Sequence, residues 1–247
     1  MKAMIFAAGL GTRLKPLTDT VPKALIPIDG KPLLEHVINK LKQAEITEII
    51  VNVHHHPGQI IDFLKKKNHF DIRIEISDER EMLLDTGGGI KKAASFFDDG
   101  KPFLIHNVDI ISNLDIRTLY AKHLQDETRL ATLTVSYRNT SRYLLFSKEN
   151  QLHGWINIKT GETKPNAMID TDMFQKFAFA GIQVVSPKIF KLMEKESNKF
   201  PIVDFYLRNC ENHKIVGFVP ENFQMIDVGK LDSLKKAEEL ARNLDSI

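Results

Sequence analysis

The residues best suited to bind a phosphate lie in one short segment near the N-terminus. Residues 7–13 read Ala-Ala-Gly-Leu-Gly-Thr-Arg after an apolar run, and Pro22-Lys23 comes about ten residues later. Glycines that directly follow a strand let backbone N–H groups approach phosphate oxygens closely and form an anion-binding nest. Arg13 and Lys23 would add positive charge on the same side. A tight turn alone would explain the glycines but neither cation, so the segment predicts a phosphate-binding loop.

The spacing within this segment excludes two common phosphate-binding motifs. Leu14 stands where the third glycine of a dinucleotide-binding fingerprint would fall, and Pro16 interrupts the helix that should follow. No Gly-Lys-Ser/Thr follows at the spacing that a Walker loop needs. The loop therefore has to be of another kind.

Two aspartates are candidate ligands for a hard cation. Asp109 comes at the end of a predicted buried strand, and ligands of open α/β sheets bind beyond the carboxyl ends of the strands. Asp227 lies in the sequence Met-Ile-Asp-Val-Gly of residues 225–229, and together the two carboxylates could hold the cation through oxygen ligands. Taken singly, each aspartate could equally be a helix cap or a turn residue.

Three consecutive glycines follow Thr86, just before a helix predicted over residues 90–97. The missing side chains would leave room for a flat ring against bare backbone, whose N–H and C=O groups could read the edges of a nucleobase. The alternative is a flexible start of the helix. We predict that Thr86, Gly87 and Gly88 contribute to a nucleotide site.

Three consecutive histidines, residues 54–56, invite a zinc interpretation. Successive side chains on an extended segment point to opposite faces, so the three rings are poorly placed to share one metal ion. A structural or pocket-lining role is favoured instead.

Composition and charge narrow the class of protein. The chain has 247 residues, of which 43% are hydrophobic and 27% charged, which suits one large α/β domain or two small ones with a full core. The formal net charge is +2 without a basic patch, which argues against a nucleic-acid partner. Cys210 is the only cysteine, so no internal disulfide can form and a cytoplasmic setting is favoured. The apolar run at the N-terminus is too short for a signal peptide or a membrane span, and no membrane partner is expected.

Strands and helices alternate in the first half of the sequence, which predicts an α/β fold with a doubly wound, mostly parallel sheet. The predicted strands and helices of this half are, in chain order, strand 3–7, helix 33–41, strand 49–53, helix 58–66, strand 72–76, helix 90–97 and strand 102–105. The second half is richer in strands, predicted at 130–137, 143–146, 151–158, 177–185, 214–219 and 224–228, with helices at 187–196, 201–209 and 231–243. We interpret residues 1–247 as a single domain with a β-rich insertion.

The glycine-rich loop and Pro22-Lys23 resemble those of the sugar-1-phosphate nucleotidyltransferases, whose signature is Gly-x-Gly-Thr-Arg followed by Pro-Lys. The resemblance runs from Met1 to the C-terminal helix, and it implies a Rossmann-like fold in which the β-rich insertion serves the sugar. It also implies that Arg13, Lys23 and Asp109 are catalytic, the two cations by neutralising a triphosphate. The residues that it assigns to the nucleotide are Ala8, Gly9, Gly11, Thr12, Arg13, Lys23, Thr86, Gly87 and Gly88.

The same resemblance implies a magnesium ion on Asp109 and Asp227. The sequence departs from the family pattern at Val108, where glycine is usual, and at Gln224 or Met225, where an aromatic residue is common. Neither change removes a carboxylate, so the prediction of Mg²⁺ as cofactor is kept.

The sugar site is predicted from a second stretch. Residues 179–182, Phe-Ala-Gly-Ile, resemble the strand that lines the sugar pocket of the family, which points to Gly181. Trp155 and Asn157 are expected on a hairpin nearby and are the other predicted sugar-binding residues. Lys164 receives no role, because the family's Glu-Lys-Pro element is only loosely matched here.

The triple glycine resembles the N-acetylmuramate-1-phosphate uridylyltransferases of bacterial cell-wall recycling more closely than the mannose-1-phosphate guanylyltransferases. The implied partners are a nucleoside triphosphate and a sugar 1-phosphate, with UTP and N-acetylmuramate 1-phosphate first and the guanylyl pair second. A nucleotide-sugar glycosyltransferase should carry Asp-x-Asp, but residues 107–109 read Asn-Val-Asp. A non-catalytic nucleotide-sensing subunit would have no need of the two cations and two aspartates together. The sequence leaves the oligomeric state open.

Overall fold

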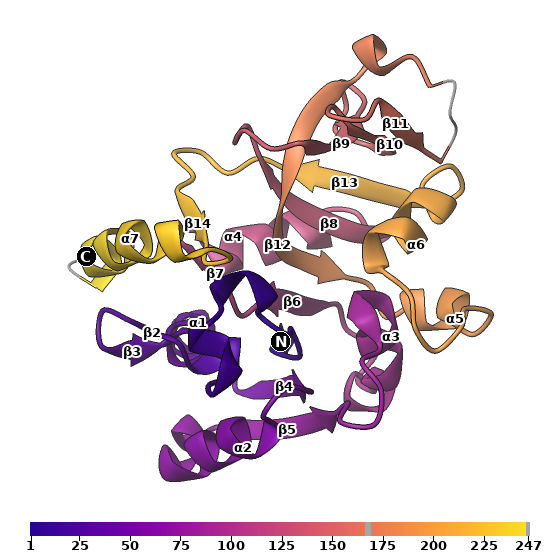
Figure 1. The fold of residues 1–247 in the computed structure, drawn as a ribbon. Helices are drawn as coiled ribbons and strands as arrows, with labels where there is room; N and C mark the ends of the chain where they lie inside the picture. The colour runs from indigo at the N-terminus through magenta and orange to yellow at the C-terminus, as the bar shows by residue number, and fades with distance from the viewer. Residues whose placement is uncertain (166–168, 246–247) are drawn as a thin grey trace.

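The computed structural model describes residues 1–165 and 169–245, and its centre is a ten-stranded mixed sheet (Figure 1). The strands of this sheet are β1 (Lys2–Phe6), β4 (Glu48–Val53), β5 (Arg73–Asp78), β6 (Phe103–Asn107), β8 (Arg129–Ser136), β9 (Arg142–Phe146), β10 (Leu152–Asn157), β11 (Glu162–Lys164), β12 (Gln175–Val185) and β13 (Lys214–Phe218). Their order is β11-β10-β9-β12-β6-β1-β4-β5, while β8 pairs with both β12 and β13. Two small sheets join β2 (Pro27–Ile28) to β3 (Lys31–Pro32) and β7 (Ile110–Ser112) to β14 (Met225–Asp227).

The first half of the chain forms the parallel part of the sheet. β1 lies between β4 and β6 and is parallel to both, and β5 continues the parallel order beyond β4. Ala3, Met4 and Ile5 in β1 are fully buried, as expected for a strand whose two faces are both covered. The chain leaves β1 toward β4 on one side and returns through β6 on the other. The carboxyl end of β1 is therefore the topological switch point, where ligands of such sheets bind.

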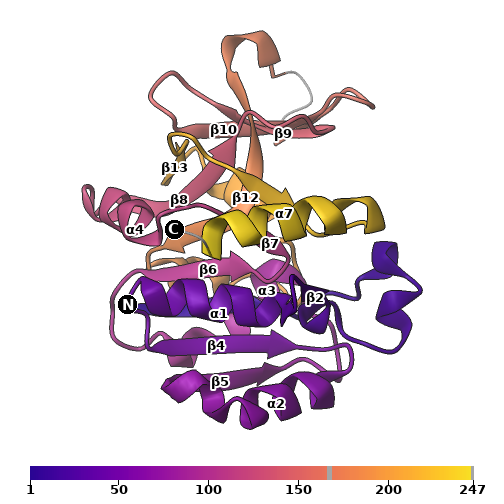
Figure 2. The ribbon, with the colours of Figure 1, turned by 90° about the vertical axis from the view of Figure 1, so that its left-hand side faces the viewer.

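Helices cover both faces of the sheet (Figure 2). They are α1 (Leu33–Gln43), α2 (Pro57–Lys66), α3 (Asp85–Lys92), α4 (Ile116–Leu124), α5 (Ile189–Met193), α6 (Ile202–Asn209) and α7 (Leu234–Asp245). The helices α1, α2, α4 and α7 bury their apolar residues in one core cluster, and α3, α5 and α6 bury theirs in a second cluster. No helix within the described ranges is long and apolar enough to cross a membrane.

The second half of the chain adds the antiparallel part. β12 pairs antiparallel with β6, β8 and β9, and β9, β10 and β11 form a meander at the top of Figure 1. The α/β class, the mostly parallel order of the first half and the β-rich insertion are thus confirmed.

Several details of the sequence prediction were wrong: the short strands β2, β3 and β7 were not predicted, and two helices differ from those expected. α3 begins at Asp85, so the three glycines lie inside the helix rather than before it. α4 was not predicted. Its N-terminus is capped by Asp115, whose carboxylate accepts hydrogen bonds from the backbone N–H groups of Arg117 and Thr118.

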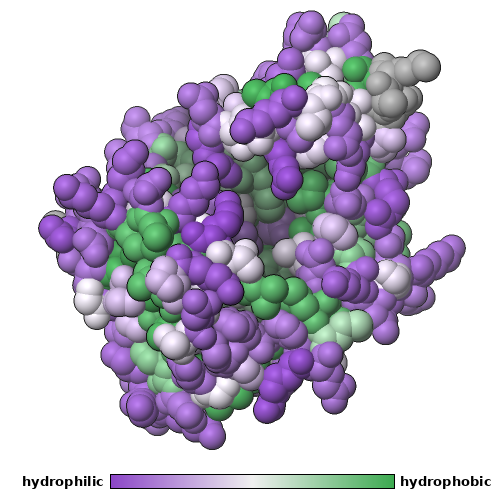
Figure 3. All heavy atoms as spheres, viewed as in Figure 1, coloured by the Kyte–Doolittle hydropathy of each residue, from purple (hydrophilic) through white to green (hydrophobic). Residues whose placement is uncertain are grey.

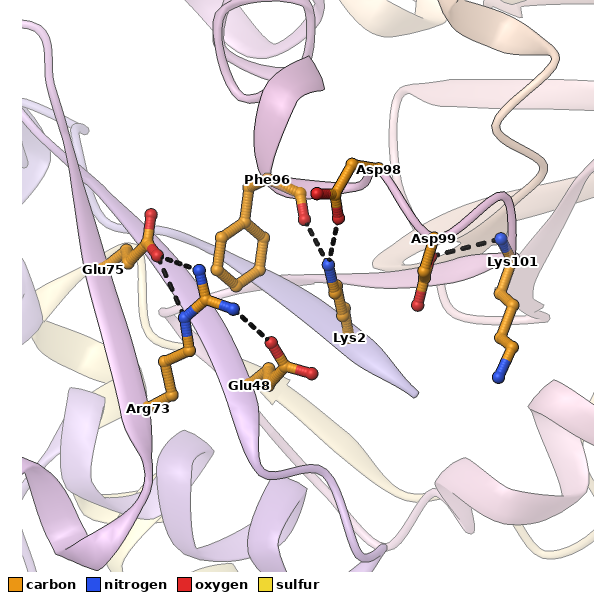
Figure 4. Close-up of polar contacts among 8 residues, drawn as sticks. All are labelled: Lys2, Glu48, Arg73, Glu75, Phe96, Asp98, Asp99 and Lys101. Atoms are coloured by element: carbon orange, nitrogen blue, oxygen red, sulfur yellow. Dashed lines mark hydrogen bonds and ion pairs between the residues drawn. The ribbon is translucent and has the colours of Figure 1, made fainter.

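The amino ends of the parallel strands are held by a cluster of ion pairs (Figure 4). At the start of β1, the buried Lys2 donates from Nζ to the carbonyl oxygen of Phe96 at 2.6 Å and to Asp98 Oδ1 at 2.7 Å. Arg73, at the start of β5, donates to Glu48 Oε2 at the start of β4 at 2.6 Å. The amino ends of these strands are thus linked to one another and to the Phe96–Asp98 segment by ion pairs. A ligand is expected at their carboxyl ends instead.

Candidate active site

The loop that follows β1 is shaped by Gly11. Its φ of +64° lies in the left-handed region, and a Cβ there would come within 2.7 Å of Thr18 Cγ2. Thr18 Oγ1 also donates to the carbonyl oxygen of Gly11 at 2.9 Å, which pins the turn. Gly9 has nothing within 4 Å of the position of a Cβ. Gly11 is therefore required by the fold of the loop, whereas Gly9 leaves open space for a ligand.

A cavity of about 500 Å³ opens at the carboxyl ends of β1 and β6. Figure 3 shows this face of the molecule hollowed near its centre. Eight of the predicted site residues line the cavity: Ala8, Gly9, Gly11, Thr12, Arg13, Lys23, Thr86 and Asp109. The structure thus brings the phosphate loop, its two cations, one aspartate and the start of α3 to one place.

Lys23 and Asp109 form an ion pair at the floor of this cavity. The two side chains are only 10% and 21% exposed, so their charges are shielded from water and depend on each other. Lys23 is the first residue of a short 3-10 turn (Lys23–Leu25) that follows Pro22. Asp109 is the second residue after the end of β6. An anionic ligand would compete with Asp109 for the same ammonium group.

Asp227 is brought beside Asp109 by backbone pairing. β14 runs antiparallel to β7, with Asp227 opposite Ile110, and the N–H of Val228 donates to the carbonyl oxygen of Asp109 at 2.8 Å. Burial raises the pKa of Asp227, and the negative charge of Asp109 raises that pKa further. A Cβ on Gly229 would lie 2.8 Å from Asp227 Oδ1 and 2.9 Å from Arg13 Nη2, so the ends of these two side chains converge on Gly229.

The two aspartates fit a divalent cation. Asp227 Oδ1 is buried and has no hydrogen-bond donor, so a cation would satisfy it and offset the repulsion from Asp109. The described part of the chain contains no group of three or more His, Cys, Asp or Glu side chains that could hold a metal ion, so the protein ligands here would be these two carboxylates alone. Magnesium commonly takes one or two carboxylates and completes its shell with substrate phosphates and water.

The reason for the three glycines in α3 differs from the one predicted. A Cβ on Gly87 would lie 2.2 Å from Phe200 Cε2, and a Cβ on Gly88 would lie 2.1 Å from the carbonyl oxygen of Asn198. The backbone N–H groups of both glycines point toward the carbonyl oxygen of Phe200, at 2.8 and 3.3 Å. The space beside the two glycines and their N–H groups are therefore used by residues 198–202 rather than by a ligand. Neither glycine lines the cavity. Only Thr86 of the predicted trio lines the cavity.

Four polar side chains of the cavity wall were missed in the sequence. They are Asn52 at the end of β4, Glu79 after β5, Asn107 at the end of β6, and Lys199 in the segment that packs against α3. Asn52 interrupts an otherwise apolar strand, which is a signal that could have been used. Lys199 has no such signal, because it is an exposed lysine whose position depends on a packing contact distant in sequence.

The predicted sugar residues separate into two groups. Gly181 has a φ of +74° at an irregularity of β12, and a Cβ there would lie 2.6 Å from Asn107 Nδ2, so it lies directly behind the cavity wall. Trp155 does not line the cavity; Lys164 Nζ lies 5.3 Å from the centre of its ring. Asn157 also lies outside, where its Oδ1 accepts from the N–H of Lys159 in the β10–β11 turn.

The three histidines contact backbone carbonyl groups. His54 Nδ1 lies 2.7 Å from the oxygen of Glu79, His55 Nε2 lies 3.0 Å from that of Thr18, and His56 Nε2 lies 3.2 Å from that of Asp19. Two of them therefore anchor the segment that follows the phosphate loop to the end of β4. This is the structural role favoured from the sequence.

Backbone N–H groups, two cations and a pair of aspartates come together at the switch point of a parallel sheet, an arrangement that suits the binding of a polyphosphate. The chain belongs to the nucleotidyl transferase family, whose model matches residues 2–243. It is a sugar-1-phosphate nucleotidyltransferase.

Its relatives and neighbours agree with this family. The chain is 42% identical to N-acetylmuramate alpha-1-phosphate uridylyltransferase of Caulobacter vibrioides over 228 residues, which cover 90% of each chain. It is 30% identical to mannose-1-phosphate guanyltransferase of Aspergillus fumigatus over 93% of this chain and 61% of that one. The fold matches the inositol-1-phosphate CTP transferase of T. maritima with a TM-score of 0.77 and 17% identity, over 99% of this chain and 96% of that one.

Proposed function

We propose that the protein transfers the uridylyl group of UTP to N-acetylmuramate 1-phosphate and releases pyrophosphate. The observation that carries this choice is the 42% identity to the Caulobacter vibrioides uridylyltransferase over 90% of both chains. The cavity supports the reaction class, since it gathers two cations and a row of backbone amides around a space of about 500 Å³.

In the proposed reaction, an oxygen of the sugar phosphate attacks the α-phosphorus of UTP in line with the leaving group. A new P–O bond forms, the bond from the α-phosphorus to the bridging oxygen breaks, and the electron pair leaves on pyrophosphate. Both reactants are anions, so catalysis must come mainly from positioning and charge neutralisation. Arg13 and Lys23 supply that charge from the loop side of the cavity, and the N–H groups of residues 8–12 orient the phosphates.

Magnesium is the cofactor that we propose, held by Asp109 and Asp227. When bound there, it would lower the negative charge on the reacting phosphates as a Lewis acid. Lys23 already neutralises Asp109 and lines the same cavity. The protein itself thus places the ammonium group of Lys23 next to Asp109 and the guanidinium group of Arg13 beside Asp227.

The nucleobase is expected beside the start of α3. The N–H groups of Gly87 and Gly88 are already bonded to Phe200, so the base must be read mainly by Asp85, Thr86 and the neighbouring cavity wall. Uracil presents one N–H donor between two carbonyl acceptors, while guanine presents an additional amine that Asp85 could accept. Guanylyl transfer to mannose 1-phosphate is therefore the second candidate, and the Aspergillus fumigatus relative favours it.

A competition experiment decides between the two candidates. UTP and GTP are supplied at equal concentration with each sugar 1-phosphate in turn, and pyrophosphate and both nucleotide sugars are measured. A site built for one set of base edges rejects the other, because buried polar groups are left without partners. A clear preference for GTP or for mannose 1-phosphate would overturn the choice of substrates. The absence of pyrophosphate with every pair would overturn the reaction itself.

The proposed setting is the cytoplasm, in the recycling of cell-wall sugars. This setting is supported by the single cysteine, Cys210, which is buried and forms no disulfide, and by N-acetylmuramate being a sugar of the bacterial cell wall. Fractionation of cells that produce the protein would test the location.

A further inference from the structure

Two buried polar side chains, Asn52 and Glu79, meet behind the cavity. Asn52 Nδ2 donates to Glu79 Oε1 at 2.8 Å, and the two residues are only 3% and 1% exposed. Both line the cavity wall. Polar groups buried to this degree are normally fully hydrogen-bonded, so their other partners show what they hold in place.

The oxygen of Asn52 holds the start of the phosphate loop. The ladder between β1 and β4 ends with Phe6 opposite Asn52. Beyond it, Asn52 Oδ1 accepts from the backbone N–H groups of Ala7 at 2.7 Å and Ala8 at 3.3 Å. The side chain thus continues the strand pairing where the backbone of β4 has turned away. It fixes the direction in which the loop leaves β1.

Glu79 holds the start of α3. Its Oε2 accepts from the backbone N–H of Leu84 at 3.1 Å, the residue just before Asp85. Glu79 is itself fixed, because its own N–H donates to the carbonyl oxygen of Val53 at 2.8 Å. A Cβ on Gly89 would lie 3.0 Å from Glu79 Oε1 and 3.2 Å from Asn52 Nδ2, so α3 packs directly on the pair.

We propose that Asn52 and Glu79 are positioning residues for the nucleoside triphosphate. The pair joins the loop that receives the phosphates to the start of α3, which lines the same cavity with Asp85 and Thr86. One hydrogen bond therefore sets the distance between two parts of the nucleotide site that come from different segments. The inference concerns whichever nucleoside triphosphate the enzyme uses, and so does not depend on the choice of UTP.

Glu79→Gln separates positioning from a simple charge effect. Removing a negative charge from a cavity that binds a polyanion should tighten binding if charge alone mattered. The two donors, however, point at different oxygens of Glu79: Asn52 at Oε1 and the N–H of Leu84 at Oε2. In glutamine one of these oxygens is replaced by an NH2 group, so one of the two donors would face another donor. A buried donor left without an acceptor is costly, and we expect the KM for the nucleoside triphosphate to rise by about tenfold or more. The KM for the sugar phosphate should change less than threefold.

A complementary pair of variants supplies the rescue. Asn52→Asp keeps the acceptor for Ala7 and Ala8 but sets a second carboxylate against Glu79, so it should raise the same KM. In the double variant Asn52→Asp with Glu79→Gln, the glutamine amide donates to the aspartate and its carbonyl oxygen accepts from Leu84. All four hydrogen bonds and the net charge are restored, and the KM for the triphosphate should return to within about threefold of wild type.

The control is Glu48→Gln, which removes a carboxylate from the amino end of β4, the strand that carries Asn52 near its carboxyl end (Figure 4). It should leave both KM values unchanged. Steady-state kinetics with each substrate varied, and melting temperatures of all variants, make the measurement. An unchanged or lower KM for the triphosphate in the single variants would overturn the inference, as would an equal rise for both substrates or a failure of the double variant to recover. If Glu79→Gln does not fold, Asn52→Asp and the double variant decide in the same way.

Discussion

Gly88→Ala should destabilise the protein even though alanine is the better helix former. In a helix interior, alanine is favoured over glycine by about 1 kcal/mol. In α3, however, a Cβ on Gly88 would lie 2.1 Å from the carbonyl oxygen of Asn198 and 3.0 Å from the Cβ of Leu84. The obstacle is backbone rather than a flexible side chain, so residues 198–200 would have to retreat by about 1 Å.

The size of the effect follows from what that retreat disturbs. Four hydrogen bonds join the segment to α3 and the residue before it. The Phe200 oxygen accepts from the N–H groups of Gly87 at 2.8 Å and Gly88 at 3.3 Å, Phe200 N–H donates to the Leu84 oxygen at 3.3 Å, and Ile202 N–H donates to Thr86 Oγ1 at 2.9 Å. Each contributes about 1 kcal/mol net, and overpacking typically costs about 1–3 kcal/mol. Against the gain in helix propensity, we expect a net loss of about 2 kcal/mol, or roughly 4–8 °C in melting temperature for a chain of this size.

Urea and thermal denaturation of Gly88→Ala and Gly58→Ala make the comparison. Gly58 lies near the start of α2 with nothing within 4 Å of its Cβ position, so that variant should match or slightly exceed the stability of the wild type. Phe200→Ala should partly relieve Gly87→Ala, whose main obstacle is the Phe200 ring, but should not relieve Gly88→Ala. A Gly88→Ala protein as stable as the wild type would refute the reasoning.

Three further predictions concern other residues. Asp109→Asn keeps the shape of the side chain but removes its charge, so turnover should fall by about a hundredfold or more; near-normal rates with unchanged magnesium dependence in both Asp109→Asn and Asp227→Asn would place the metal elsewhere. Burial lowers the pKa of His123 from 6.5 to about 4, so the unfolded chain binds a proton that the folded chain does not. Stability should therefore fall as the pH drops through that window, and His123→Leu should reduce the difference in urea stability between about pH 7.5 and pH 5; an undiminished difference would contradict this. Burial raises the pKa of the Cys210 thiol, so a thiol reagent should label the native protein far more slowly than the unfolded one, and equal rates would show that the thiol is accessible.

The parallel half of the fold could be predicted because its signals are local. The strand at residues 49–53 is apolar apart from Asn52, and α1 shows apolar residues at helical spacing, all of which are buried in the structure. The phosphate loop was predictable for the same reason, since its glycines and cations lie within a short stretch. α4 was missed because one of its buried positions, after Ile116 and Leu119, is His123, which breaks the apolar pattern.

The rest of the site depends on contacts between segments far apart in the sequence. Nothing near Gly87 and Gly88 indicates that residues 198–202 will pack on them, although the missing side chains are a prerequisite for that contact. Lys199 lines the cavity because its neighbours Asn198 and Phe200 pack against these glycines. The distance of Trp155 and Asn157 from the cavity could not be predicted either, because a hairpin can be predicted locally but its distance from the cavity is set by the whole sheet.

The active site is built from segments that lie far apart in the sequence, and this constrains when the protein can become active during its synthesis. A nascent chain of about 190 residues already contains the phosphate loop, β1, β4, β6 and α3. It still lacks the segment that fills the grooves at Gly87 and Gly88, and it lacks β14, which carries Asp227 and pairs with β7. Contacts of such long sequence separation form late, because the loops that they close are entropically costly. Catalytic competence should therefore arrive in one step, only after residues 198–202 and β14 have been synthesised and have packed against the first half of the chain.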